Sequence, residues 1–287
     1  MDAYKVVIVD DSSFSITFIK DILETAGLNV VGSAKNLEEV KKVVAETKPD
    51  LVTMDMTLPG TDGLECTRAV HQIDKNIKVI VVSSMMDDEI VKKAKKTKVS
   101  AYVQKPVDSV ELLNAIQRVM DFEKLFESLK ESYYEVYKEA FADAMTRMAK
   151  VKPELKEEYS NDLEHASSGI TVMIAIIGKF TGRLMIDFSQ ESARGFAKEI
   201  LKREPEDNDE ILEILAEFTN IVAGNGCSIL NKKNSAYSLR LAPPSILRGE
   251  HVLISALNFQ TDTAVAKTTF GEVKLDVGFK RGEEKWM

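Results

Sequence analysis

The N-terminal part of the chain alternates short apolar runs with longer amphipathic segments, and this rhythm restricts the possible fold more than any other feature. Short apolar runs suit buried strands, and the segments between them have helical spacing. The order is typical of βα units around a parallel sheet. The expected strands are residues 4–9, 30–33, 51–54, 78–82 and 101–103.

Reactive or polar side chains follow four of these expected strands. Asp10 and Asp11 follow the first strand, Asp55 the third, Ser83 the fourth and Lys105 the fifth. In an open parallel sheet the carboxyl ends of all strands lie at one edge, where ligands bind. We therefore expect three carboxylates, a hydroxyl and an ammonium to converge on a small patch.

Three carboxylates at such a patch repel one another unless a cation lies between them. A hard divalent ion with oxygen ligands, most simply Mg²⁺, meets this need and leaves positions for phosphoryl oxygens. Asp55 can then act as a nucleophile on phosphorus while Lys105 offsets charge on the transferred group. Each residue alone could merely cap a strand or begin a helix, but their occurrence at matching strand ends favours the functional interpretation.

The motifs at these strand ends resemble those of response-regulator receiver domains over about residues 1–122. The matching elements are Asp10-Asp11, Asp55 with Leu58-Pro59-Gly60 and Asp62-Gly63, Ser83-Ser84, and Tyr102 ahead of Lys105-Pro106. The resemblance implies a flavodoxin-like, doubly wound α/β fold with a five-stranded parallel sheet.

The resemblance also implies a site chemistry. A histidine kinase would transfer a phosphoryl group to Asp55. Asp11, Asp55 and the backbone carbonyl of Thr57 would bind Mg²⁺ directly, and Asp10 would act through water. In the same family pattern Ser83 contacts the phosphoryl group and Tyr102 changes rotamer as a switch.

Two further expectations come from the same pattern. The bond between Lys105 and Pro106 is expected to be cis. Met85, two residues beyond Ser83, is apolar where polar side chains are common in the family. An apolar side chain there should hinder water from reaching the acyl phosphate.

Residues 107–152 contain no glycine or proline, and apolar residues recur there at helical intervals. We interpret this segment as one long helix or two helices nearly end to end. Residues 123–150 would be a helical linker that merges into the first helix of a second domain, 151–287. Unbroken, about 40 residues would extend roughly 60 Å. The apolar stripe should pack against a second copy, giving a homodimer, or against the second domain's sheet; it comprises Phe122, Leu125, Leu129, Tyr133 and Val136.

The second half of the chain has an α+β pattern. A β-hairpin is expected over 170–188, around Gly178 and Gly182, followed by helices near 192–202 and 210–231. Pro243-Pro244 interrupts the pattern. Antiparallel strands are then expected at 251–260, 264–270 and 272–279.

The helix expected at 210–231 carries a polar stripe opposite its apolar face. The stripe comprises Glu210, Glu213, Glu217, Asn220 and Gly224, at spacings of three and four, so Glu217 and Asn220 are neighbours. Spacing alone favours a solvated helix face. Glycine within a helix costs about 1 kcal/mol relative to alanine, and a bare position suits the close approach of another protein's backbone.

The sequence around that pair, Glu217-Phe-Thr-Asn220-Ile-Val-Ala-Gly224-Asn225-Gly226, is similar to the signature helix of the CheX family of chemotaxis phosphatases. The resemblance covers about residues 130–282 and implies dephosphorylation of CheY-type receivers. Asn220 would position the attacking water, and Glu217 would pair with the partner's active-site lysine. The stretch around Glu139 lacks the second Glu/Asn pair of the related CheC proteins, so one site per chain is expected.

Two other roles for the second domain stay open. It could bind receivers without hydrolysis, or it could mainly dimerise while the receiver drains phosphate from a kinase. A net charge of −8 argues against nucleic acid or an anionic membrane as partner. No apolar run reaches membrane-spanning length and no signal-peptide core is evident, so a cytoplasmic protein is expected. Cys66 and Cys227 are expected as buried free thiols.

Overall fold

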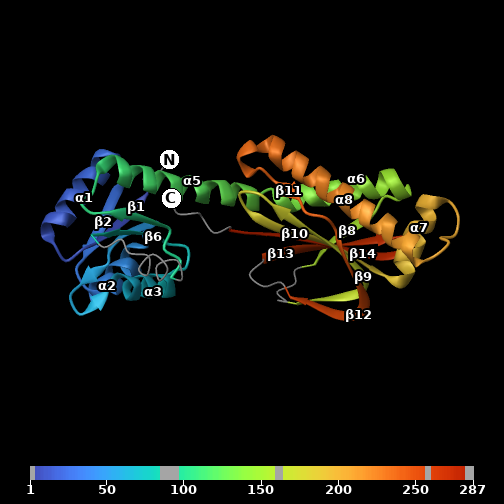
Figure 1. Ribbon diagram of the computed structural model, residues 1–287, viewed down its shortest axis with the longest axis horizontal. Helices are drawn as coiled ribbons and strands as arrows, with labels where there is room; N and C mark the ends of the chain where they lie inside the picture. Colours follow the sequence, from blue (N-terminus) through green and yellow to red (C-terminus); the bar gives the residue numbers. More distant parts are fainter. Residues whose placement is uncertain (1–3, 85–96, 159–163, 256–259, 282–287) are drawn as a thin grey trace. The chain divides into compact units, whose positions relative to one another are not determined.

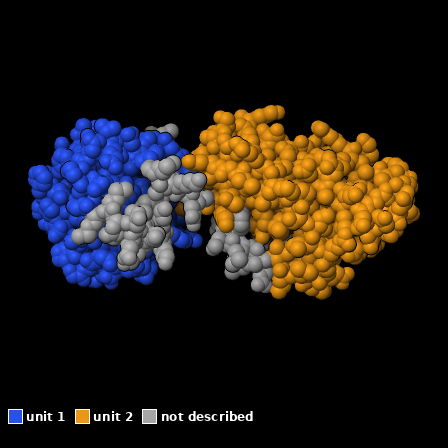
Figure 2. All heavy atoms as spheres, in the orientation of Figure 1, with its two compact units in different colours: residues 1–124, 284–287 blue, residues 125–283 orange. Residues whose placement is uncertain are grey.

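A computed structural model describes residues 4–84, 97–158, 164–255 and 260–281 of the protein. The chain divides into two compact units, one ending at Lys124 and the other beginning at Leu125 (Figure 2). Both cysteines are buried free thiols, as expected. Within the described part of the chain, no helix combines the length and the apolar character that crossing a membrane requires.

The first unit is built on a five-stranded parallel sheet, which confirms the predicted α/β class (Figure 1). The strand order is β2-β1-β3-β6-β7, and all four pairings are parallel. The strands are β1 Lys5–Val9, β2 Asn29–Ala34, β3 Leu51–Asp55, β6 Lys78–Ser83 and β7 Ala101–Gln104. Each lies within one or two residues of its expected position.

Helices cover both faces of this sheet, so it is doubly wound (Figure 1). Alternate residues of β1 point to opposite faces: Val6 and Ile8 belong to one core and Val7 and Val9 to the other. The helices that the structure describes here are α1 Ser13–Thr25, α2 Leu37–Thr47, α3 Gly63–Ile73 and α5 Ser109–Lys130. The first core contains α1 and α5, and the second contains α2 and α3. A short hairpin, β4 Thr57–Leu58 with β5 Thr61–Asp62, precedes α3.

The helical run that follows the first sheet is two helices. The first, α5, crosses the division between the units, and the second, α6, spans Tyr133–Ala149. Ser132 lies in the turn between them, and its hydroxyl donates to the carbonyls of Ser128 and Leu129, at 3.0 and 3.4 Å. Such local hydrogen bonds compete with the helical ladder. The unbroken rod of about 60 Å is therefore wrong, and the alternative with two helices is the observed one.

The second unit contains a seven-stranded sheet whose pairings are all antiparallel. Its strands are β8 Glu154–Glu158, β9 Glu164–Ile177, β10 Thr181–Ser189, β11 Arg240–Leu241, β12 Ser245–Ser255, β13 Gln260–Thr268 and β14 Gly271–Lys280. The order is β11-β9-β10-β14-β13-β8, and β12 also pairs with β9. The hairpin of β9 and β10 confirms the one expected around Gly178 and Gly182.

The strand expected at 251–260 is misplaced in our prediction. The observed strand, β12, begins at Ser245, directly after Pro243-Pro244. A shift of register between Glu250 and Leu253, with a left-handed φ of 59° at His251, marks a bulge inside the strand. The residues of that bulge resemble a turn in the sequence, so the strand was predicted to begin too late in the chain.

Three helices cover one face of the second sheet (Figure 1). They are α6, α7 Gln190–Leu201 and α8 Asn208–Lys233, and the short helix η1 Ser235–Tyr237 follows α8. Tyr133 of α6 packs on Phe279 of β14, with ring centroids 5.3 Å apart, and the hydroxyl of Tyr134 donates to the carbonyl of Thr263 at 2.9 Å. The apolar stripe was expected to pack against a second copy or against the second domain's sheet. The C-terminal part of the stripe contacts that sheet.

The contact between α6 and α8 depends on the glycine at position 226. A Cβ atom on Gly226 would lie 2.1 Å from Cε1 of Tyr137, whose ring is completely buried. The ring is also held by a contact of 3.3 Å between its hydroxyl and Sγ of Cys227. Neither helix can move away without losing core packing, so this position requires glycine.

We predict that Gly226→Ala lowers the stability of the second unit by about 1–3 kcal/mol, the usual range for an overpacked core. Gly224→Ala is the matched control, because the only described atom its Cβ would meet is Cδ1 of Leu241 at 3.9 Å. That change should stabilise the helix by up to about 1 kcal/mol. Urea unfolding followed by circular dichroism measures both. Equal midpoints for the two variants would contradict the prediction.

Candidate functional site

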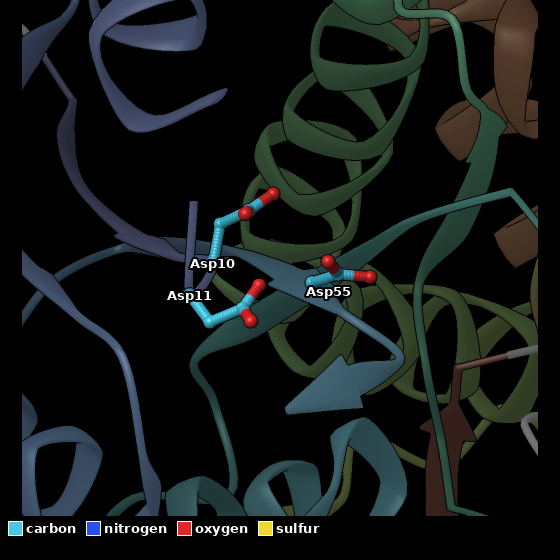
Figure 3. Close-up of side chains that lie close together, drawn as sticks. All are labelled: Asp10, Asp11 and Asp55. Atoms are coloured by element: carbon cyan, nitrogen blue, oxygen red, sulfur yellow. The ribbon is translucent and has the colours of Figure 1, made fainter. Parts of the chain in front are cut away.

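Three acidic side chains gather at the carboxyl edge of the first sheet (Figure 3). Asp10 and Asp11 directly follow β1, and Asp55 is the last residue of β3. One carboxylate oxygen from each lies within 4.8 Å of the others. The predicted convergence of these residues is thus present in the structure.

Lys105 neutralises part of this acidic patch. Its Nζ donates to Oδ2 of Asp10 at 2.8 Å and to Oδ2 of Asp55 at 2.7 Å. Burial alone would lower the pKa of Lys105, but the hydrogen bonds and charges of the two carboxylates outweigh it and raise the pKa above its usual value. The Lys105–Pro106 peptide bond is cis, as expected.

Backbone groups fix the two buried carboxylates. Asp10 is 1% exposed and accepts a hydrogen bond from the backbone N–H of Ser12 at 2.9 Å. Asp55 is 6% exposed and accepts one from the backbone N–H of Thr57 at 3.3 Å. A Cβ on Gly63 would lie 2.3 Å from the carbonyl oxygen of Asp55. Gly63 thus lets the start of α3 pass close behind Asp55, a role that we did not assign from the sequence, although the motif contains this glycine.

The other predicted receiver residues lie on the neighbouring strands. Ser83 is the last residue of β6 and is buried. Tyr102 is half-buried on β7, where it packs against the buried cluster of Leu64, Val81 and Val99. Met85 lies outside the described residues.

The acidic patch has the donor set of a magnesium site. All its ligand atoms are carboxylate oxygens, which are the ligands that Mg²⁺ prefers. Asp11 is exposed, so an ion can reach the patch from solvent. The residues present therefore fit a hard divalent cation.

A second constellation lies on α8. Glu217 and Asn220 are both exposed, while Phe218 and Thr219 between them are completely buried. Among the described residues, no side chain forms a hydrogen bond or ion pair with Glu217 or Asn220. Gly224 leaves bare backbone one turn further along the same face. The predicted stripe is thus an open surface with an unused carboxylate and an unused amide.

The stripe divides into two parts. Glu210 is paired with the guanidinium of Arg203 and also accepts the backbone N–H of Glu206 at 2.8 Å. These partners, Arg203 above all, lower the pKa of Glu210 below its usual value. Glu210 thus anchors the loop before α8, whereas Glu213 and Glu217 are exposed and no side chain in the described part of the protein pairs with them.

Comparison with known proteins gives two family matches. The response regulator receiver domain matches residues 6–117, and the chemotaxis phosphatase CheX matches residues 170–266. The chemotaxis protein CheY of Thermotoga maritima is 36% identical over 115 residues, which are 40% of this chain and 96% of that protein. The CheY of Bacillus subtilis is 34% identical over 119 residues, which are 42% of this chain and 99% of that protein.

Similar solved structures include both kinds of domain. A CheX from Desulfovibrio desulfuricans has a TM-score of 0.47 and 18% identity, and the match covers 52% of this chain and 99% of that one. A CheX–CheY–BeF₃–Mg²⁺ complex from Borrelia burgdorferi has a TM-score of 0.40 and 29% identity, and covers 41% and 89%. The classification rests on the family matches and the CheY relatives. This chain belongs to the response regulators and joins a CheY-like receiver domain to a CheX domain.

We predict that Asp55→Asn abolishes phosphate incorporation from acetyl phosphate, because an amide is not a nucleophile towards phosphorus. Mass spectrometry of the intact protein measures this. Asp62→Asn is the control, since Asp62 caps α3 by accepting the N–H of Glu65 and asparagine caps equally well. Incorporation that persists in Asp55→Asn at another residue would refute the assignment.

We also predict that Mg²⁺ raises the midpoint of thermal unfolding of the receiver. An ion at about 100 times its dissociation constant stabilises by about 2.7 kcal/mol. Asp11→Asn should remove most of the shift, whereas Asp62→Asn should keep it. An equal shift in wild type and Asp11→Asn, measured against a chelator, would place the ion elsewhere.

Proposed function

We propose that a histidine kinase phosphorylates this protein on Asp55 and that its CheX domain hydrolyses the phospho-aspartate of CheY-type receivers. The observation that carries the proposal is the exposed pair Glu217 and Asn220, to which no described side chain binds, beside the bare backbone of Gly224. The pair lies within the residues that match the CheX family. The receiver half is supported by Asp55 in contact with Lys105 at the carboxyl edge of the sheet.

In the phosphorylation step, a carboxylate oxygen of Asp55 attacks the phosphorus of a phosphohistidine. The new P–O bond forms as the P–N bond breaks, and the kinase histidine takes up a proton. Lys105 offsets the charge on the phosphoryl oxygens, and the Ser83 hydroxyl contacts one of them. Tyr102 then changes rotamer as the switch. Asp10, Asp11, Asp55 and the backbone carbonyl of Thr57 would hold Mg²⁺, which supplies further charge compensation when bound.

In the hydrolysis step, α8 approaches the phosphorylated site of a receiver. The carboxylate of Glu217 pairs with the partner's active-site lysine, the counterpart of Lys105 here, and so fixes the register. The amide of Asn220 then orients a water in line with the bond to be broken. Both groups are available for this because no described side chain binds them. A general base is not needed, since acyl phosphates are already activated and orientation supplies several kcal/mol.

We predict that Asn220→Ala lowers the rate of receiver dephosphorylation by about 10²–10³, the effect of losing one preorganised group. Glu217→Ala should mainly raise KM, because its ion pair aids docking. Both variants should fold, since both side chains are exposed. Phosphate release from a panel of phosphorylated CheY-type receivers provides the measurement.

The matched control is Glu213→Ala, an exposed carboxylate one turn before Glu217 on the same face. Glu213→Ala should raise KM for the phosphorylated receiver much less than Glu217→Ala does. A wild-type rate in the Glu217→Ala/Asn220→Ala double variant would refute this site. Binding of phosphorylated receivers without any phosphate release would instead identify a docking module.

A further inference from the structure

We infer that Lys35 is a second cation of the receiver site, which attracts the anionic phosphodonor and so raises the rate at which Asp55 is phosphorylated. The inference rests on the proposed function and adds to it a residue that sets the rate of its first step. The group that Lys35 attracts is the phosphoryl group that acyl phosphates and phosphohistidine share.

Lys35 directly follows β2, at the same edge of the sheet as the three carboxylates. Val9, the last residue of β1, pairs with the last residue of β2 and with the residue before Asp55 in β3. The N–H of Asp10 donates to the carbonyl of Ala34 at 3.1 Å. Lys35, Asp10 and Asp55 therefore stand side by side on three neighbouring strands. At about 4.8 Å per strand, the backbone of Lys35 is about 10 Å from that of Asp55.

A hydrogen bond holds the ammonium of Lys35 at the rim of the acidic patch. Its Nζ donates to Oγ of Ser13 at 2.6 Å. Ser13 is two residues beyond Asp11, and Ser12 between them donates its backbone N–H to Asp10 at 2.9 Å. Two residues span at most about 7 Å, so the ammonium is on the order of 10 Å from the carboxylates, which is the Debye length at 0.1 M salt.

The charge of this ammonium is not offset by an ion pair. Among the residues that the structure describes, no carboxylate pairs with Nζ of Lys35, and the hydroxyl of Ser13 is neutral. The carboxylate of Glu39 serves the loop instead, because it accepts the backbone N–H of Lys35 at 2.8 Å and the side-chain amide of Asn36 at 2.9 Å. Lys35 itself is exposed, so its charge can act on an ion that arrives from solvent.

Lys35 and Lys105 lie on opposite sides of the patch. Lys35 follows β2 and Lys105 follows β7, which are the two outer strands of the sheet. Lys105 is bound directly to Asp10 and Asp55. With three carboxylates against this one ammonium, the patch keeps an excess of negative charge that repels an anionic donor. The ammonium of Lys35 reduces this repulsion on the side of β2.

The stability of α1 does not explain the position of Lys35. Ser13 is the first residue of α1, so the ammonium lies at the positive end of the helix dipole, where a cation is unfavourable. The same end is already capped by Ser12, whose hydroxyl accepts the N–H of Ser15 at 3.3 Å. A role in attracting an anion accounts for this placement.

The step that Lys35 accelerates is the transfer already proposed for Asp55. A carboxylate oxygen of Asp55 attacks phosphorus, and the bond from phosphorus to the acetate oxygen or the imidazole nitrogen breaks. The leaving group takes the electron pair. Lys35 forms no covalent bond and moves no proton. It raises the local concentration of the donor, and salt screens this effect.

Phosphorylation rates of full-length variants test the inference. Acetyl phosphate and phosphoimidazole are used in parallel as small acyl-phosphate and phosphohistidine donors, at saturating Mg²⁺, and mass spectrometry follows incorporation at Asp55. Lys35→Gln keeps a hydrogen-bond donor for Ser13 but loses the charge. We expect it to lower the second-order rate constant about threefold to fivefold at about 0.01 M ionic strength, and Lys35→Glu about tenfold. At about 0.5 M both losses should nearly disappear. Lys35→Arg should behave as wild type.

The matched control is Lys75→Glu, which changes the net charge equally. Lys75 is exposed and lies in the turn before β6, at the opposite edge of the sheet. Lys75→Glu should leave the rate constant almost unchanged. Thermal unfolding of each variant shows whether the receiver keeps its stability.

An effect with either donor supports the inference for that donor. Wild-type rate constants in Lys35→Gln and Lys35→Glu at low salt, with Asp55 still phosphorylated, would overturn it and leave the proposed function intact. A loss that salt does not reduce would indicate a structural role and also overturn it. Equal losses in Lys75→Glu and Lys35→Glu would assign the effect to net charge alone. Wild-type phosphorylation at a residue other than Asp55 would refute both the inference and the proposed function.

Discussion

The ammonium of Lys105 is the interaction on which the receiver site depends. It lies within 2.8 Å of one oxygen each of Asp10 and Asp55, and both carboxylates are almost fully buried. Without it, two like charges would face each other away from water, at a cost of several kcal/mol. The same contacts tie the ends of β1, β3 and β7 together. The ammonium of Lys105 thus stabilises this edge of the sheet and also belongs to the site at which we propose phosphorylation.

Helix α8 of the second unit has one buried, structural face and one exposed face, on which we propose the functional pair. Its buried face is fixed by close packing on α6, where Gly226 admits the ring of Tyr137. Its C-terminal end is fixed by Asn231, whose side chain accepts the N–H of Leu239 and donates to its carbonyl, at 2.8 and 2.9 Å. These contacts fix the backbone of the helix, while the side chains of Glu217 and Asn220 are exposed to solvent. Such support is what a preorganised site needs.

Much of the fold was predictable because its signals are local. The five strands of the first sheet are short apolar runs bounded by polar residues, and all five were placed within one or two residues. The misplaced start of β12 comes from the bulge near His251, whose residues resemble a turn. The sequence left open whether the segment after the first sheet is one helix or two, because the break at Ser132 involves no glycine or proline. The strand register settles the first case and the side-chain hydrogen bonds of Ser132 mark the second.

The sequence by itself determined that the acidic residues meet at one sheet edge, since parallel strands place their carboxyl ends together. It likewise determined that Glu217 and Asn220 share one helix face, because their spacing matches the helical repeat. Only the tertiary structure decided which charges are paired internally: Lys105 binds Asp10 and Asp55, and Arg203 pairs with Glu210, whereas no described side chain pairs with Glu217. It also decided that Gly226 is a packing residue and Gly224 a surface one. These distinctions depend on the approach of groups distant in sequence, which periodicity does not encode.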